Sequence, residues 1–84
     1  MNSNQCVAKN KREHDIEQHL VYAVRRRQGL CPKWVSPGLG GVPDRVILLP
    51  SGRIAFAELK APGKPLRSLQ RRRRAQLEAL GFQV

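Results

Sequence analysis

The sequence predicts a small α/β domain in which a short mixed β-sheet is flanked by helices, in the order α-β-β-β-α with a possible short last strand. Three observations predict this class. Residues 11–28 and 68–80 each repeat apolar side chains at helical spacing, and a glycine follows each stretch. Between them, two apolar runs, 45–49 and 53–60, surround turn-forming residues, which is the pattern of a β-hairpin. A chain of 84 residues is expected to form one domain.

The first helix is predicted over about 11–28, after a polar segment 1–10 that we expect to be flexible; the domain proper is then 11–84. Its apolar residues share one face: Ile16, Leu20, Ala23 and Val24. Gly29 stands where a C-terminal cap belongs. Glu13 and Glu17 lean toward the apolar face, which is unusual because unpaired buried carboxylates are costly.

A short strand is predicted over 33–36, followed by the glycine-rich loop 36–41, which cannot form regular structure. The hairpin comes next. A two-residue turn would place Asp44 opposite Leu59, and a three-residue turn would place it opposite Glu58. Either register brings Asp44 and Glu58 close to Lys60.

The second hairpin strand ends with two charged residues. Side chains alternate between the two faces of a strand, so Ile54, Phe56, Glu58 and Lys60 share one face. An acid and a lysine therefore end an otherwise apolar face, beside Asp44.

The second helix is predicted to begin with Ser68 as its N-cap, to run to Leu80 and to stop at Gly81. Gln70 lies seven residues before Leu77 and shares its face, so Gln70 is expected to point inward. Residues 82–84 are the possible short last strand.

Charge and composition restrict the class of partner. Sixteen Lys and Arg against six Asp and Glu give a net charge of +10, which favours DNA or RNA, although a solubilising basic surface has the same composition. Cys6 and Cys31 have no metal-ligand spacing. No signal peptide, membrane span or nucleotide-binding P-loop is present, so we expect a cytoplasmic protein without a nucleotide cofactor.

The two carboxylates at the end of the hairpin repel each other unless a cation or a shared proton neutralises them. Hard oxygen ligands suit Mg²⁺ or Mn²⁺, which can polarise a phosphate and lower the pKa of a bound water. Lys60 would orient that water and offset transition-state charge. Glu17, or less favourably Glu13, could add a ligand from the first helix. Taken alone, Glu-x-Lys is a common and weak motif that more often marks an exposed cross-strand pair than a catalytic site.

The ordered set of motifs is more specific. Pro43-Asp44, thirteen intervening residues and then Glu58-Leu59-Lys60 resemble the PD-(D/E)XK nuclease superfamily. The chain is more narrowly similar to the minimal, stand-alone form of the VRR-NUC family found in phages and bacteria. Supporting stretches cover about 11–84: Ile16-Glu17, Ser36-Pro37-Gly38, Gly41-Val42, Ala61-Pro62-Gly63, Leu69-Gln70 and Leu80-Gly81-Phe82.

The resemblance implies a role for each matching residue. Asp44, Glu58 and the backbone carbonyl of Leu59 would hold the metal, and Lys60 would be the catalytic lysine. Glu17 matches the acidic residue of the first helix, where it could bind metal through water. Gln70 matches a glutamine beside the site. The implied activity is metal-dependent cleavage of branched DNA, similar to Holliday-junction resolution.

DNA contacts are expected from basic and polar side chains around the site and on the second helix: Lys33, Ser36, Arg45, Lys64, Arg67, Arg71, Arg72 and Arg74. A homodimer would supply two sites for a two-fold symmetric junction, and a partner chain could cover the edge left by a short last strand. Two alternatives remain open: a flap or nicking nuclease, and a basic nucleic-acid-binding module without catalysis.

Overall fold

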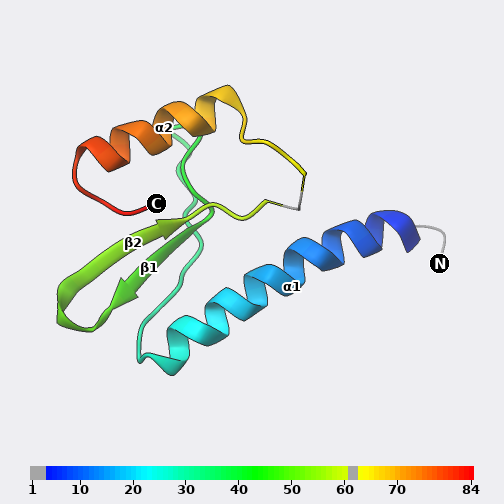
Figure 1. Cartoon of the computed structure of the whole chain (residues 1–84), viewed down its shortest axis with the longest axis horizontal. Coiled ribbons are helices and arrows are strands. Elements are labelled where there is room, and N and C mark those ends of the chain that lie inside the picture. Colours follow the sequence, from blue (N-terminus) through cyan, green and yellow to red (C-terminus); the bar gives the residue numbers. More distant parts are fainter. Residues whose placement is uncertain (1–3, 61–62) are drawn as a thin grey trace.

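A computed structural model of the chain describes residues 4–60 and 63–84, with side chains described from residue 13 onward. The chain is a small α/β protein with two helices and one antiparallel hairpin (Figure 1). Its elements follow in order: α1 (Asn4–Arg26), β1 (Arg45–Leu49), the 3-10 turn η1 (Pro50–Gly52), β2 (Arg53–Ala57) and α2 (Ser68–Ala79).

The hairpin adopts the register that a three-residue turn requires. Arg45 pairs with Ala57 and Val46 with Phe56, around η1. Ser51 and Gly52 both have positive φ, 68° and 72°, which reverses the chain sharply at the tip. One position beyond the Arg45 pair, this register sets Asp44 opposite Glu58.

The strand predicted over 33–36 is wrong as a regular element. Within this range Lys33 forms one isolated antiparallel bridge, with Arg45 of β1, and Leu30, which precedes the predicted range, forms another with Leu48. Pro32 lies between them and has no N–H to donate, so the pairing cannot be continuous. Its carbonyl still accepts a hydrogen bond of 3.0 Å from Val46 N.

The possible last strand is also reduced to one bridge. Gln83 lies parallel to Ala55, and its carbonyl accepts a hydrogen bond of 2.8 Å from Phe56 N. The hairpin is therefore flanked by an antiparallel segment on one edge and a parallel one on the other. The pairing is mixed, as expected, although only two segments form regular strands.

The hairpin lies between the two helices (Figure 1). On the α1 side, Leu20 and Val24 border the same hollow as Ile47 and Leu49. On the other side, the Phe56 ring has Trp34 at 5.1 Å and Phe82 at 5.4 Å between ring centroids. The alternation of β1 and β2 thus gives each helix its own apolar face.

The ends of α1 differ from the expectation. The helix begins at Asn4 rather than near Lys11; residues 1–3 lie outside the described range, and the flexibility of 1–10 stays a prediction. At the other end, we expected Gly29 to cap the helix, but the positive φ of 64° is found at Gln28. A glycine is needed at position 29 because the backbone passes close to β1 there, and a Cβ would overlap the carbonyl oxygen of Leu48.

The end of α2 matches the sequence pattern. Gly81 has a φ of 98°, and Phe82 N donates a hydrogen bond of 3.1 Å to the Leu77 carbonyl, as in a glycine-terminated helix. The start differs by one residue. Arg67 occupies the N-cap position, and its backbone N–H is capped by Gln70, so Ser68 is the first helical residue.

The hydrophobic core is thin, as the short chain predicts. Within the described part of the chain, three hydrophobic side chains are buried, Val24, Cys31 and Leu77, together with Pro43. Cys31 carries a free thiol, and the side chain of Cys6 lies outside the described residues. None of the described helices has the length and apolar character needed to cross a membrane.

Candidate active site

Asp44 is fixed at the point where the hairpin opens. The fully buried Pro43 precedes it, and its own carbonyl accepts a hydrogen bond of 2.9 Å from Trp34 N. Its carboxylate is exposed, but Oδ2 accepts a hydrogen bond of 3.0 Å from the backbone N–H of Leu59. This contact ties the start of β1 to the segment after β2, and it holds the Asp44 carboxylate beside Glu58.

Glu58 has an unusual environment for a carboxylate. Its Oε1 is shielded from solvent and has no hydrogen-bond partner among the described residues. Burial raises the pKa of the Glu58 carboxyl to about 7, and the adjacent Asp44, which can share a proton with it, adds to the rise. The positive charge of Lys60 acts against this increase. Asp44, Glu58 and Lys60 therefore interact electrostatically at one end of the hairpin.

Glu17 reaches the same region from α1 and is neutralised there. Its Oε2 accepts a hydrogen bond of 2.8 Å from Arg45 Nε and forms an ion pair of 2.8 Å with Arg45 Nη2, with side-chain exposures of 12% for Arg45 and 22% for Glu17. Arg45 Nη1 also donates to the Cys31 carbonyl at 2.7 Å. The half-buried acid noted in the sequence thus has an internal partner. The expected DNA contact of Arg45 would compete with these bonds.

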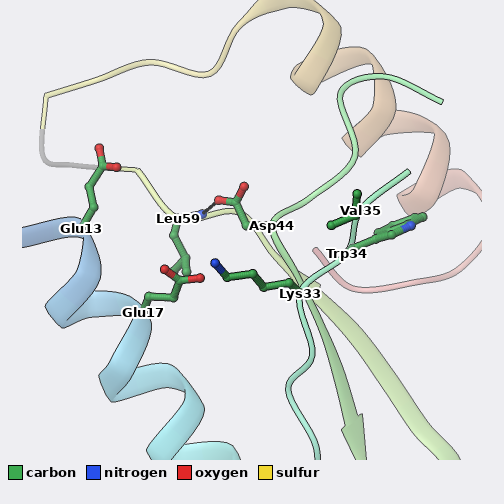
Figure 2. A pocket seen from close by; sticks show the side chains of 7 residues that line it. All are labelled: Glu13, Glu17, Lys33, Trp34, Val35, Asp44 and Leu59. Atoms are coloured by element: carbon green, nitrogen blue, oxygen red, sulfur yellow. Dashed lines mark hydrogen bonds between the residues drawn. The ribbon is translucent and has the colours of Figure 1, made fainter. Parts of the chain in front are cut away.

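A pocket of about 310 Å³ lies between α1 and the opening of the hairpin (Figure 2). Seven residues line it: Glu13, Glu17, Lys33, Trp34, Val35, Asp44 and Leu59. Glu58 and Lys60 flank the Leu59 backbone but are not part of the lining. Of the expected site residues, Asp44 and Glu17 line this acidic pocket. Glu58 and Lys60 lie outside the lining, where Glu58 is electrostatically coupled to Asp44 and to Lys60.

Gln70 is not part of this lining. Its side chain is half-buried, and its Oε1 accepts a hydrogen bond of 2.8 Å from Arg67 N, which caps α2. A catalytic role for Gln70 stays a prediction.

The remaining expected DNA contacts divide into two groups. Lys33 lines the pocket and Ser36 is half-buried in the glycine-rich loop, close to the site. The others are exposed on α2 or just before it: Lys64, Arg67, Arg71, Arg72 and Arg74. Two of these arginines have local contacts, Arg71 with the Leu66 carbonyl at 3.2 Å and Arg74 with Glu78 at 3.3 Å.

One residue that supports the site was not singled out in the sequence. Arg73 Nε donates a hydrogen bond of 2.8 Å from α2 to the Gly40 carbonyl, and its Nη1 contacts Gln76. Gly41 has a φ of 75°, and a Cβ there would meet the Leu69 backbone. The glycine-rich loop is thus held against α2. Four consecutive arginines conceal this role, because the sequence does not show which of them faces the loop.

The chemistry of the donors fits a hard divalent cation. Among the described residues, no three His, Cys, Asp or Glu side chains are close enough to bind a metal by themselves. Mg²⁺ does not require three, because one or two carboxylates usually suffice when water and phosphate oxygens complete the sphere. The exposed Asp44 carboxylate and Glu58, whose Oε1 has no hydrogen-bond partner among the described residues, would provide that pair.

The fold and the site define a small, strongly basic α/β protein with an acidic pocket at one end of a β-hairpin. Over 73 residues, the chain is 53% identical to "Putative nuclease p44" of Acyrthosiphon pisum secondary endosymbiont phage 1, a match that covers 87% of this chain and 78% of that protein. The chain belongs to the nuclease family of this phage protein. No model of a known protein family matches it, so the narrower resemblance to VRR-NUC stays a prediction.

Proposed function

We propose that the chain is a metal-dependent DNA endonuclease of the VRR-NUC type, with a PD-(D/E)XK core. The observation that carries the proposal is the pairing of Asp44, held by Leu59 N, with a Glu58 carboxyl whose Oε1 lacks a hydrogen-bond partner within the described part of the chain. Two carboxyls in this arrangement are stabilised by a bound cation. A nuclease would use such a cation in catalysis.

Asp44, Glu58 and the carbonyl of Leu59 would hold Mg²⁺ or Mn²⁺. Such a cation supplies Lewis-acid polarisation of the scissile phosphate and lowers the pKa of water. Deprotonation of Glu58 is required for binding, because only the carboxylate is a good ligand. The raised pKa of Glu58 therefore makes metal affinity depend on pH near neutrality.

Lys60 would orient the attacking water and balance negative charge on the phosphate. In the hydrolysis, the water oxygen forms a new bond to phosphorus and releases a proton to solvent, the bond from phosphorus to the leaving sugar oxygen breaks, and the leaving oxygen takes up a proton from solvent. Lys60 contributes by donating a hydrogen bond and by electrostatic stabilisation. Glu17, already paired with Arg45, would act on the metal through an intervening water.

The substrate we propose is branched duplex DNA, cut by a homodimer. The net charge of +10 and the exposed arginines of α2 suit contact with phosphate backbones. The thin core and the single-bridge pairing of Gln83 at the sheet edge leave room for stabilisation by a second copy. A two-fold dimer would present two sites to a two-fold junction.

The test uses labelled four-way junction, flap and linear duplex of the same sequences, each with Mg²⁺, Mn²⁺ or EDTA. We expect metal-dependent cutting of the branched substrates that Asp44→Ala and Lys60→Ala both abolish, while Arg53→Gln, a charge loss at the far end of the hairpin, keeps it. Preferred cutting of the flap would change the substrate assignment. DNA binding without cutting by the wild-type protein would leave a basic binding module and remove the proposal.

Oligomeric state is measured separately, by light scattering of the protein bound to junction DNA. A dimer is expected, and a species with a single 9.5 kDa chain on the junction would contradict it.

A further inference from the structure

Lys33 presents a cation inside the acidic pocket. It is exposed, and it lines the pocket together with Asp44 and Glu17. Figure 2 shows its side chain extending from its own segment into the pocket, with the ammonium directed toward Glu17 of α1 and with Asp44 alongside. A lysine that served only as a peripheral DNA contact would point out to solvent instead.

The position of Lys33 is set by the same backbone that sets Asp44. Lys33 forms the bridge to Arg45, and Trp34 N donates a hydrogen bond of 2.9 Å to the Asp44 carbonyl. Residues opposite each other in an antiparallel pair have side chains on the same face. Arg45 points to α1, where it contacts Glu17, so Lys33 does as well.

Lys33 forms no ion pair within the part of the chain that the structure describes. The ion pairs there are Arg45 with Glu17 and Arg74 with Glu78. Glu17, the acid toward which Lys33 points, already has a hydrogen bond and an ion-pair contact from Arg45. Because that acid is already neutralised, the cation of Lys33 is suited to an anionic ligand.

The pocket has room for such a ligand. A water occupies about 30 Å³ in the liquid, so a pocket of about 310 Å³ can hold a phosphodiester group with part of its hydration shell. Resting on the proposed nuclease function, we infer that Lys33 binds a non-bridging oxygen of the scissile phosphodiester and stabilises the charge that grows there in the transition state. Lys33 is then a catalytic residue, in addition to Lys60.

The first test is binding, and it does not require cleavage. Trp34 is the only tryptophan of the chain and lines the same pocket, so its fluorescence reports on occupancy. A dinucleoside phosphate is titrated at low ionic strength, once with EDTA and once with Mg²⁺. We expect a saturable change in the wild type and in Arg53→Gln, and a loss of that change in Lys33→Gln. Equal binding by Lys33→Gln, or no saturable change in the wild type under either condition, would overturn the inference.

The second test separates rate from affinity on full-length DNA under single-turnover conditions. Lys33→Ala should lower the cleavage rate by about 10²-fold, as the loss of one preorganised donor does, while the dissociation constant for DNA rises by only about two- to fivefold, the effect of a single exposed ion pair. Lys33→Arg should recover part of the rate, because it keeps the positive charge.

The controls distinguish the two proposals. Arg53→Gln should match the wild type in rate, since the Arg53 side chain bonds the Pro50 carbonyl at the tip of the hairpin, away from the pocket. If the wild type cuts and Lys33→Ala cuts within about twofold of it, Lys33 is only a peripheral contact and the nuclease proposal stands. If the wild type does not cut, the nuclease proposal fails, and the dinucleotide titration decides whether the pocket binds phosphate.

Discussion

The backbone N–H of Leu59 donates a hydrogen bond of 3.0 Å to Asp44 Oδ2, and this contact joins the two ends of the hairpin across fifteen positions of sequence. It directs Oδ2 of Asp44 to the backbone and leaves Oδ1 available to the proposed metal ion. The same residue, Leu59, separates Glu58 from Lys60. One hydrogen bond therefore sets the relative positions of the proposed metal ligands and of the proposed catalytic lysine.

Asp44→Asn is expected to separate stability from activity. The amide oxygen can still accept the hydrogen bond from Leu59 N, and the repulsion between Asp44 and Glu58 is removed. The melting temperature of the metal-free variant should therefore equal or exceed that of the wild type, while DNA cleavage falls by about 10²- to 10³-fold. Thermal unfolding and cleavage assays measure the two effects, and full activity in this variant would exclude Asp44 as a metal ligand.

The pH dependence of stability follows from Glu58. Its pKa in the folded protein, about 7, is above the usual value of 4.5, so the folded state binds a proton that the unfolded chain has released. This stabilisation is complete below about pH 4.5 and is lost as the pH rises through about 7. The melting temperature of the metal-free wild type should fall over that range relative to Glu58→Gln, and parallel profiles for the two proteins would contradict the raised pKa.

Arg45 is expected to contribute to folding more than to DNA binding. Arg45→Ala leaves the half-buried Glu17 without its partner and should lower the free energy of unfolding by about 1–3 kcal/mol. Arg45→Lys should recover only part of this, because an ammonium cannot bond Glu17 and the Cys31 carbonyl in the same geometry. Urea titration measures the loss. Unchanged stability with a reduced salt dependence of DNA binding would identify Arg45 as a phosphate contact instead.

The contact between Arg73 and Gly40 should hold the loop that leads into Asp44. Arg73→Ala is expected to lower stability by about 0.5–1.5 kcal/mol, the net contribution of one hydrogen bond, and to increase hydrogen exchange in residues 36–41. Arg72→Ala is the matched control, because Arg72 is exposed on the same helix; it should change stability by less than about 0.5 kcal/mol. Equal exchange in both variants would show that the loop holds its own conformation.

Much of the site could be predicted because it depends on local rules. Strand alternation and the length of the turn were sufficient to bring Asp44, Glu58 and Lys60 together, and the three-residue turn then selected one of the two registers considered. The paired position of Asp44 and Glu58 follows directly from that choice. Gly81 likewise ends α2 as its place after the apolar stripe predicts.

The remainder depends on contacts between distant segments. Pro32 removes a donor directly before the segment that was expected to be a strand, but its effect appears only when the chain lies against β1. Arg45 was expected to contact DNA, whereas alternation places it on the α1 face, where Glu17 requires a partner. The lean of Glu17 toward the apolar face of α1 indicated that this acid needs a partner. The sequence did not show that the partner is Arg45 on β1.

Metal binding tests the central claim most directly. Mn²⁺ is titrated calorimetrically into the wild type, Asp44→Ala, Glu58→Ala and the control Glu78→Ala, an exposed acid paired with Arg74 on α2, with circular dichroism to verify that each variant is folded. We predict that the wild type and Glu78→Ala bind Mn²⁺ equally and that both site variants lose the binding. Retention of wild-type affinity in folded Asp44→Ala and Glu58→Ala would contradict a metal site at the end of the hairpin.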